Sequence, residues 1–584
     1  MTLRAIVLAA VLAAAPPTLA QPPAQTRQIQ EPQPVETPTR ALDLAGLVKQ
    51  ARDAEPLAAQ ALAAHIQILA SDEFEGRGPA SVGEQKTIAY IARQFEAAGL
   101  APAGDNATWY QDVPFVRSTV AGSKAQFVLS GGRSKAKPAP LEYGTQMVVW
   151  TKRVVDRIDV RKADLVFVGY GVVAPEKGWN DYAGQDMTGK IAVILINDPD
   201  FETSKDHPAN GVFGGRAMTY YGRWTYKFEE AARQGAAGAI IIHESAPAAY
   251  PWAVVQNSWT GAQFDIARDD KGMGRLPFEA WISTPAARGL FERAQLNFAD
   301  LKEAAQKPGF RPVPMGVQAR VRFDVAVERV LSRNVVGKLP GTDKPDEVVL
   351  YGAHWDHLGQ GGYRQDGDDI YNGAVDNATG VAALIEIARQ YRRDGAPRRT
   401  IAFAAWAGEE KGLLGSAYYA EKPLFAPAKT LANINMDGMA VWGRTRDVVV
   451  TGAGQNELED WLGELAAAQG RVIEPEPFPE HGYYYRSDHF NLARIGVPAI
   501  SADGGVDVRG KGAQWGRDRA GEYTAQRYHK PDDEYDPHWD LSGLSEDGFL
   551  LYGLGRRVAN SDQWPGWKPG SEFKAAREAS LAGR

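Results

Sequence analysis

Three ionisable side chains stand together where a buried strand of this chain is expected to end. The apolar residues 348–351 lead directly into the segment His-Trp-Asp-His at 354–357. Imidazole and carboxylate groups bind metal ions and move protons. His354, Asp356 and His357 therefore indicate a metal site or an acid–base site at the end of this strand.

Acidic side chains recur at the boundaries of the next predicted elements. Asp376, in GAVDNATG, precedes a helix, Glu409 and Glu410 follow the strand TIAFAAWAG, and Asp437 ends NINMD. Several carboxylates in one cleft repel one another and stay ionised only beside a cation. If the four acids meet at one edge of a sheet, the pattern predicts a divalent metal there.

The composition restricts the ligands that such a metal could have. The chain has no cysteine, so His, Asp and Glu would have to hold the ion. Mixed imidazole and carboxylate ligands suit zinc, with manganese or cobalt as possible substitutes. A bridging carboxylate could hold two such ions about 3.5–4 Å apart, the spacing of hydrolytic two-metal sites.

Nine histidines are available as ligands. His354 is the strongest candidate, and His357 suits a supporting position beside it. His65 is expected in a helix core, and His207 and His243 in a strand end or surface loop. Spacing leaves the distal ligand open among the last four histidines, which are His481, His489, His529 and His538.

The elements that position these residues alternate between strand and helix from about residue 325. Continuous apolar strands between helices predict an α/β fold with a mostly parallel sheet covered on both faces. Ligands of such sheets bind at the carboxyl ends of the strands. The expected strands are EVVLYGAH, TIAFAAWAG, LANINMD and VPAISAD, and the helices are TGVAALIEIARQYRR, ELEDWLGELAAAQG and SEDGFLLYGLGRRVAN.

The region before this alternation has a different pattern. Residues 58–100 are expected to be helical and to stop at Gly99. From about 163 to 290, short apolar runs are separated by glycine-rich turns, which predicts a compact β-rich module of its own. Its strands are expected at ADLVFVGYGV, GKIAVILIND and AAGAIIIHES, with a helix at YKFEEAARQGAAG.

The first 42 residues have the pattern of an export signal followed by a linker. Arg4 precedes a short apolar run, and the small residues Thr18 and Ala20 predict cleavage near Ala20. The run is too short for a membrane span, and no cysteine follows that could carry a lipid anchor. We expect a periplasmic or secreted protein whose residues 21–42, rich in Pro, Gln and Thr, form a disordered linker.

Length and charge limit the remaining possibilities. A chain of 584 residues is expected to form two or more domains. A net charge of −7 and a pI near 5.8 give no reason to expect nucleic acid or an acidic membrane as a partner. The oligomeric state stays open.

The order of these motifs resembles the zinc aminopeptidases of family M28. His-x-Asp is followed by Asp-Asn-x-Thr-Gly, then Glu-Glu-x-Gly-x-x-Gly-Ser, then Asp, and finally a histidine in YHKPDD. LASDEFEGRGPASVGEQ is similar to the N-terminal helical part of that family, and the β-rich module resembles its protease-associated (PA) domain. The resemblance covers most of residues 58–560.

The resemblance implies a phosphorylase/hydrolase-like α/β sandwich with a mostly parallel mixed sheet and an inserted β-rich PA domain. The implied division is a signal peptide (1–20), a linker (21–42), an N-terminal part of the peptidase domain (43–155), a PA-like domain (160–290), a catalytic zinc peptidase domain (320–560) and a C-terminal tail (561–584).

The resemblance also implies two zinc ions and a set of ligands. His354 and Asp437 would bind one ion, and Glu410 and His529 the other. Asp376 would bridge both. The YHKPDD context favours His529 over His489, whose Ser-Asp-His context matches a structural or substrate-side motif of the family.

Three further residues receive catalytic roles by the same resemblance. Glu409 would be the general base, and Asp356 would orient His354. Tyr528 would donate to the oxyanion that forms on the substrate. The neighbouring tyrosines at 483–485 compete with Tyr528 for that role.

The implied activity is that of an exported aminopeptidase acting on peptides or small proteins. A carboxypeptidase or dipeptidase of the same fold, a single-zinc glutaminyl cyclase, and a receptor-like binding protein without metals are the alternatives. The complete ligand set, with Asp376 between the two ions, favours a two-zinc hydrolase over the last two. No membrane anchor and no nucleic-acid partner are expected.

Overall fold

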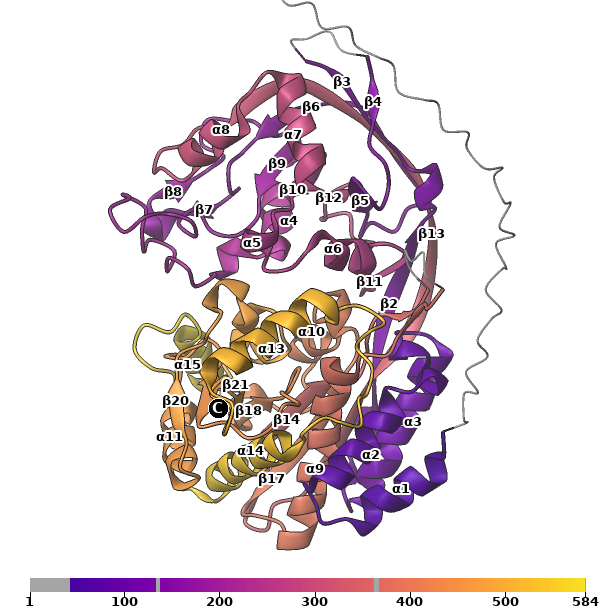
Figure 1. Ribbon diagram of the computed structural model, residues 1–584, viewed down its shortest axis with the longest axis vertical. Coiled ribbons are helices and arrows are strands. Elements are labelled where there is room, and N and C mark those ends of the chain that lie inside the picture. Colours follow the sequence, from indigo (N-terminus) through magenta and orange to yellow (C-terminus); the bar gives the residue numbers. More distant parts are fainter. Residues whose placement is uncertain (1–41, 133–136, 362–366, 583–584) are drawn as a thin grey trace, which may run out of the picture. The chain divides into compact units, whose positions relative to one another are not determined.

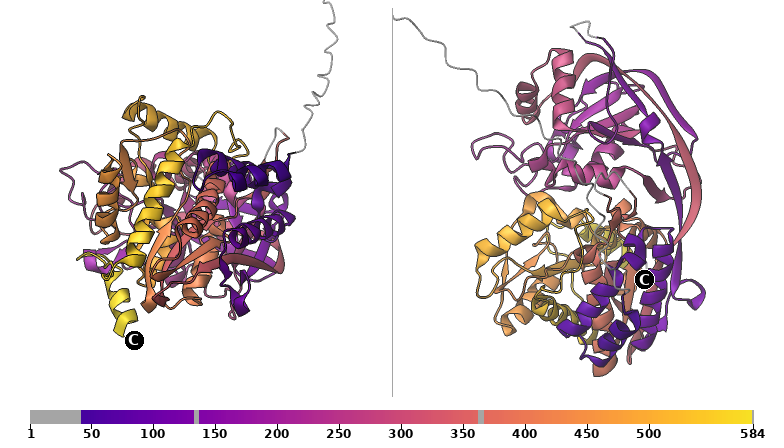
Figure 2. Two further views of the ribbon diagram at one scale, coloured as in Figure 1. Left: turned by 90° about the horizontal axis from the view of Figure 1, so that it is seen from below. Right: turned by 45° about the vertical axis from the view of Figure 1, so that its right-hand side comes forward.

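In the computed structural model, one long strand belongs to both of the protein's large sheets (Figure 1). Strand β13 (Val313–Leu339) pairs through its first half with β3 and β6, and through its second half with β2 and β17. Figure 2 shows the paired strands β13 and β2 running side by side. We call the two sheets the module sheet and the central sheet.

The structure describes residues 42–132, 137–361 and 367–582. The predicted signal peptide, 1–20, and all of the predicted linker except Leu42 lie outside these residues. Residues Asp43–Arg584 form one compact unit. Among the described residues, no helix has both the length and the apolar character needed to cross a membrane.

The central sheet has the predicted parallel core. Strands β17 (Arg399–Trp406), β14 (Lys344–His354), β18 (Thr430–Asn435) and β21 (Ala499–Gly504) lie next to one another in that order, and each pair is parallel. The edges are antiparallel: β13 and then β2 (Tyr110–Val120) lie beyond β17, and β19 (Asp447–Val450) lies beyond β21, followed by β20 (Val472–Glu474). The fold is therefore mixed α/β, as expected.

The central strands are apolar along their length because helices cover both faces of the sheet. Alternate residues of β14 and β17, such as Tyr351 and Phe403, pack with helices α9 (Thr379–Asp394) and α14 (Ser542–Asn560). The residues between them, such as Leu350 and Trp406, pack on the opposite face with Tyr419 of α10 (Leu414–Glu421) and Leu492 of α12 (His489–Arg494). Side chains of a strand alternate between faces, so a strand buried on both sides has no polar positions.

The N-terminal helices extend the first of these layers. Helix α1 (Leu44–Asp53) is followed by α2 (Ala59–Leu69) and α3 (Val82–Ala97), and α2 packs on α9. Ser81 caps α3 by accepting a hydrogen bond from the N–H of Glu84, and Gly99 follows its end with a φ of +75°. The helical prediction for residues 58–100 is thus confirmed for both helices.

The β-rich module forms around the other half of β13. Beyond β13, its sheet runs through β6 (Arg157–Phe167), β9 (Ile191–Leu195), β10 (Gly238–Ile242), β12 (Glu279–Ile282) and β5 (Met147–Trp150). On the other side of β13 lie β3 (Gln126–Gly131) and β4 (Ala139–Pro140). Helices α4 (Trp224–Arg233), α6 (Trp252–Trp259), α7 (Thr284–Ala294) and α8 (Phe298–Ala305) belong to the same module.

The module is larger than the predicted range 160–290. Strands β3 and β5 precede residue 160, α7 extends past residue 290 and α8 follows it, yet their apolar residues share one core with the strands between them. Strand β11 (Ala262–Ile266) lies inside the range but pairs with β2 of the central sheet. Local changes of sequence pattern did not mark these long-range pairings.

The C-terminal segment and one helix also differ from the sequence-based expectation. Trp567 and Phe573 of the predicted tail are buried together beside α12, and helix α15 (Lys574–Ala582) follows. Helix α13 (Ala513–Gln526) was not expected. Within it only Gly516 is fully buried, so its sequence has no apolar face for a periodicity search to detect.

A buried arginine ties the N-terminal helical part to the strand ends of the central sheet. The Arg77 side chain is fully buried and donates hydrogen bonds to four main-chain carbonyls at 2.5–2.9 Å. These acceptors are Leu69 at the end of α2, Trp355 after β14, and Asn372 and Gly373 before α9. A planar guanidinium can serve these acceptors together, which a lysine ammonium cannot do with the same geometry.

Replacing Arg77 by Met should lower the free energy of unfolding by about 3 kcal/mol or more, because four buried carbonyls lose a charged donor. The free energy of unfolding of Arg77→Lys should lie between those of Arg77→Met and the wild type. Denaturant titration would measure both, with Arg93→Met, at an exposed position of α3, as the control. An Arg77→Met protein as stable as the control would contradict this account.

Candidate metal centre

The five predicted metal ligands meet at the carboxyl ends of the central strands. His354 ends β14, Asp376 precedes α9, Glu410 follows β17, Asp437 follows β18, and His529 follows α13. His354, Asp376 and His529 are buried, and Glu410 and Asp437 are partly buried. Parallel strands bring these distant segments of the chain to one edge.

One group of donor atoms surrounds His354. Its Nε2 lies 3.0 Å from Asp437 Oδ1 and 3.2 Å from Asp376 Oδ1. Candidate ligand atoms of all three residues lie within 4.8 Å of one another. The Nδ1 of His354 contacts the main-chain oxygen of Asp356 at 3.1 Å, and a carbonyl only accepts, so Nδ1 carries the proton. In the neutral imidazole, Nε2 is then free to bind a metal.

A second group of donor atoms uses the other oxygen of Asp376. His529 Nε2 lies 3.4 Å from Asp376 Oδ2 and 2.9 Å from Glu410 Oε2. His357 Nδ1 lies 2.6 Å from Glu410 Oε1, and His357, Asp376 and Glu410 also have the spacing of a metal site. Asp376 thus faces both groups with one oxygen each, which is the geometry of a bridging carboxylate.

The donor set fits a divalent cation. Nε2 of His357 is buried without a hydrogen bond, whereas its Nδ1 forms an ion pair with Glu410 Oε1. Buried polar atoms are normally paired, so the unpaired Nε2 beside the carboxylates of Asp376 and Glu410 indicates a missing partner. Imidazole nitrogens and carboxylate oxygens are the donors that a sulfur-free zinc site would use.

The electrostatics of the isolated side chains show how strongly the groups interact. Hydrogen bonds from His354 and His529 hold the pKa of Asp376 well below its usual value, although burial alone would raise it. His529 is also buried, but the charges of Glu410 and Asp376 raise its pKa to about 9. Burial raises the pKa of Glu409 well above its usual value, and the charge of Asp437 adds to this effect.

Asp356 acts differently from the expectation. Its carboxylate Oδ1 is 3.9 Å from His354 Nδ1, and it is the main-chain oxygen of Asp356 that accepts from the imidazole. The carboxylate instead accepts a hydrogen bond from the main-chain N–H of Glu409 at 3.0 Å. The orienting contact is therefore made by the backbone, and the Asp356 side chain fixes the segment that carries Glu409.

Asp533 supports the Asp376 loop and was not singled out from the sequence. Its carboxylate accepts hydrogen bonds from the N–H groups of Val375 and Asp376, each at 3.1 Å, and from the Tyr523 hydroxyl at 3.2 Å. Asp533 lies in the YHKPDD motif, four residues after His529. The motif contained the residue, but its role depends on a contact across the fold.

The β-rich module reaches the metal centre through two polar side chains of α6. Ser258 Oγ lies 2.9 Å from His529 Nδ1, and Asn257 Nδ2 donates to the main-chain oxygen of His529 at 3.1 Å. These contacts hold both the ring and the backbone of His529. Nothing in the sequence pattern distinguished Ser258 or Asn257 from other polar residues.

The other late histidines lie elsewhere. His489 is fully buried, its ring meets that of Tyr484 edge to face, and burial lowers its pKa to about 3. His481 contacts the Tyr483 hydroxyl at 2.7 Å, and His538 is exposed. Of the four candidates left open by spacing, the structure brings His529 to the acidic cluster.

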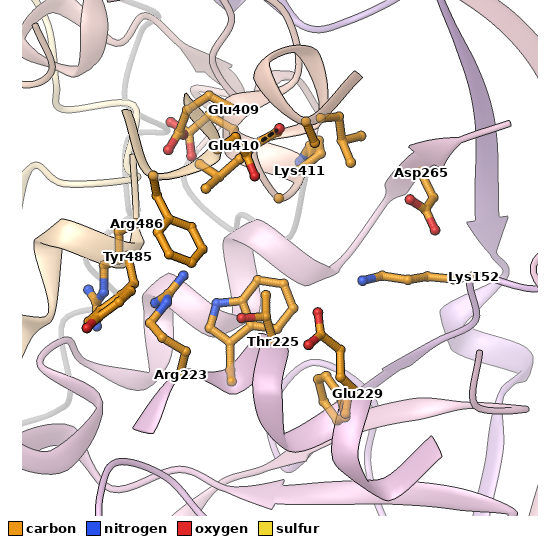
Figure 3. Close-up of a pocket in the computed structure, with 18 of the residues that line it drawn as sticks. Lys152, Arg223, Thr225, Glu229, Asp265, Glu409, Glu410, Lys411, Tyr485 and Arg486 are labelled. Atoms are coloured by element: carbon orange, nitrogen blue, oxygen red, sulfur yellow. Dashed lines mark hydrogen bonds between the residues drawn. The ribbon is translucent and has the colours of Figure 1, made fainter. Parts of the chain in front are cut away.

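A cavity of about 440 Å³ opens beside the metal centre between the module and the central sheet. Figure 3 shows Glu409, Glu410 and Lys411 on the central-sheet side, with Arg223, Thr225 and Glu229 on the module side. A ligand in this cavity would contact Glu409 and Glu410 directly.

Tyr528 also lines this cavity, and its ring stacks on His529 with 4.0 Å between centroids. Burial raises the pKa of Tyr528 well above its usual value, so its hydroxyl keeps its proton. Among the competing tyrosines, Tyr485 reaches the cavity, but its hydroxyl donates to Glu572 at 3.3 Å. Tyr528 is thus the tyrosine of this set that lies against a candidate ligand.

Parts of this chain are similar to known proteins. The family model described as Peptidase family M28 matches residues 334–552. A mouse protein named Aminopeptidase NAALADL1 is 36% identical over 139 residues, which are 22% of this chain and 17% of that protein. A probable zinc metalloprotease of Pyrenophora teres f. teres is 41% identical over 122 residues, or 21% of this chain and 24% of that protein. The chain therefore spans less than a quarter of the length of these curated relatives.

Among solved structures, the aminopeptidase from Aneurinibacillus sp. strain AM-1 is similar to this chain with a TM-score of 0.49 and 18% sequence identity. The similarity covers 90% of this chain and 97% of that one.

Replacing Ser258 by Ala should weaken metal binding about 10- to 100-fold, because the ring of His529 loses the partner that fixes its orientation. Competition with a chromogenic chelator would measure the affinity. Ser245→Ala, an exposed serine of the same module, is the matched control. Equal affinities in the two variants would show that the module does not position His529.

Proposed function

We propose that this protein is an exported metallopeptidase that uses two zinc ions to remove N-terminal residues from peptides or small proteins. The match of residues 334–552 to the model of peptidase family M28 supports this proposal. The observation that carries the proposal is the position of Asp376. One of its oxygens faces His354 and the other faces His529, so two sets of donors share one carboxylate. Such sharing is typical of hydrolytic two-metal sites.

The ligand set of the proposal has two halves. His354 and Asp437 would hold one ion, and Glu410 and His529 would hold the other. Asp376 would bind both ions. His357 is a further candidate for the second ion, because its Nδ1 also faces Glu410. The donor chemistry and the name of the zinc metalloprotease relative support zinc. When bound, a zinc pair supplies Lewis acidity, which polarises a peptide carbonyl and acidifies water.

Glu409 is the proposed general base. It lines the cavity next to Glu410, and its Oε2 lies 4.0 Å from His354 Nε2, so it borders the ligands without belonging to either donor group. The hydrogen bond from its N–H to Asp356 fixes its main chain. From this position Glu409 can take a proton from the attacking water and deliver it to the leaving amine.

Tyr528 is the proposed donor to the developing oxyanion. Its ring stacks on His529, and its hydroxyl stays protonated in this buried position. A donor held in a cavity shielded from water stabilises a developing charge more strongly than water does. The β-rich module, which we propose to be PA-like, would form the opposite wall and hold His529 through Ser258.

Carboxypeptidase or dipeptidase activity is the second candidate. The observation that favours it is a pair of arginines, Arg223 and Arg486, in the cavity wall. A panel of aminoacyl-p-nitroanilides and dipeptides on the zinc-loaded protein would separate the two activities. Export rests on the signal-peptide pattern, and N-terminal sequencing of native protein should find Gln21 first.

The purified protein should contain close to two zinc ions per chain, and chelation should abolish hydrolysis until zinc or cobalt is restored. Elemental analysis together with aminoacyl-p-nitroanilide turnover tests this expectation. His529→Ala should lose one ion, while His489→Ala, at a buried histidine away from the cluster, should keep both. Full activity in protein shown to be free of transition metal would refute the proposed mechanism.

Glu409→Gln should reduce kcat by about 100- to 10,000-fold, the usual contribution of a positioned general base. Its zinc content should stay near two, because Glu409 lies outside the ligand groups. Glu410→Gln is the matched neighbour and should lose zinc instead. Near-normal turnover by Glu409→Gln would mean that another group takes the proton.

A further inference from the structure

Two arginines of the cavity wall are buried or partly buried and have no carboxylate partner among the described residues. Arg223 precedes α4 of the module, and Arg486 lies shortly before α12. Three other basic residues of the same wall are paired with acids. These pairs are Lys152 with Glu279 (3.8 Å), Arg275 with Asp265 (3.6 Å) and Arg268 with Glu421 (3.4 Å).

Both guanidinium groups are poorly satisfied by the protein itself. Arg223 is only 7% exposed, and its Nε has no hydrogen-bond partner. The Nε of Arg486 is also buried and unpaired, although another of its nitrogens donates to the Ala248 carbonyl at 3.1 Å. An aromatic ring lies beside each guanidinium group. The guanidinium carbon of Arg223 is 5.9 Å from the centroid of the Trp224 ring, and that of Arg486 is 5.2 Å from the centroid of the Tyr250 ring.

The two positive charges are close enough to influence each other. Burial and, to a smaller extent, the charge of Arg486 together lower the pKa of Arg223 to about 10. Bringing two like charges together out of water is costly unless an anion offsets it. The fold therefore brings together two arginines with which no carboxylate of the described residues forms an ion pair.

This site belongs to the same cavity as the proposed catalytic groups. Arg223 and Arg486 share its wall with Glu409, Tyr528 and His529. In Figure 3, the Arg223 side chain rises from the module toward the side that carries Glu409 and Glu410, and Arg486 lies on that same flank of the cavity, next to Tyr485. A substrate held at the metal centre would place its neighbouring groups within this cavity.

We propose that Arg223 and Arg486 together bind a carboxylate of the substrate, so that the protein prefers peptides with a carboxylate close to the scissile bond. Guanidinium groups bind carboxylates through paired, charge-assisted hydrogen bonds. The carboxylate belongs either to an acidic side chain or to the C-terminus of a very short peptide. The inference rests on the proposed peptidase function and specifies its substrate class.

Two matched pairs of substrates distinguish the sources of the carboxylate. Glu-p-nitroanilide against Gln-p-nitroanilide tests the side chain, and Leu-Gly against Leu-Gly-amide tests the C-terminus. With the zinc-loaded full chain, the acid member of one pair should have a kcat/KM about 10- to 100-fold higher than its neutral partner, as expected for desolvated charge-assisted hydrogen bonds.

Arg223→Met should bring that acid-to-neutral ratio to about one, and Arg486→Met should lower it as well. The matched control is Arg233→Met, which removes the same charge at the other end of α4, where Arg233 pairs with Glu230 at 2.7 Å. The control should keep the wild-type ratio. Circular dichroism and zinc content would show that each variant is folded and loaded.

The inference is overturned if neither substrate pair favours the acid in the wild type, or if both arginine variants keep the ratio. Binding of glutarate to the zinc-loaded protein, measured by calorimetry, separates this inference from the proposed function. If no peptide is hydrolysed, the peptidase proposal fails, yet a tenfold loss of glutarate affinity in Arg223→Met still supports the arginine site. Equal affinity in the wild type and Arg223→Met would refute it.

Discussion

Repulsion between buried carboxylates is the constraint on which this structure depends. Asp356, Asp376, Glu410 and Asp533 lie at one edge of the central sheet, and all four act on the buried charge of Arg77. Burial lowers the pKa of Arg77 to about 10, which leaves its guanidinium charged at neutral pH. Arg77 offsets part of the repulsion on the side of the N-terminal helices, and a divalent metal would offset it on the side of the cavity. The loops that carry the acids are therefore held by Arg77 on one side and would be held by the metal on the other.

The module takes part in the same arrangement. Ser258 holds the ring of His529, Arg223 faces the cavity, and β11 pairs with β2 of the central sheet. A bound peptide would thus be enclosed by groups from both sheets, with the acids on one side and the arginines nearby. In the proposed function, the metal centre would supply the reactivity, and the module would add a wall that could select among substrates.

The sequence predicted those features that depend on residue type and local order. His354, Asp376, Glu410 and Asp437 stood at predicted element boundaries, and parallel strands bring such boundaries together. Ser258 could not be found in this way, because it meets His529 from 271 residues away and serines are common. The module boundaries failed for a similar reason, since β3 and β6 acquire their shared neighbour only when β13 is made. Contacts between distant segments leave no local periodicity.

The two-sheet strand β13 has a consequence for the order in which the protein is made. Val120 of β2 pairs with Val325 of β13, so about 205 residues must follow β2 before its partner is synthesised. At roughly 5–20 residues per second, this corresponds to a delay of about 10–40 s. During that time β2 can pair with β11, and the module strands can begin to assemble, but the N-terminal helices lack the parallel strands of the central sheet. The topology therefore delays the burial of the N-terminal helices until the strands that follow β13 are made.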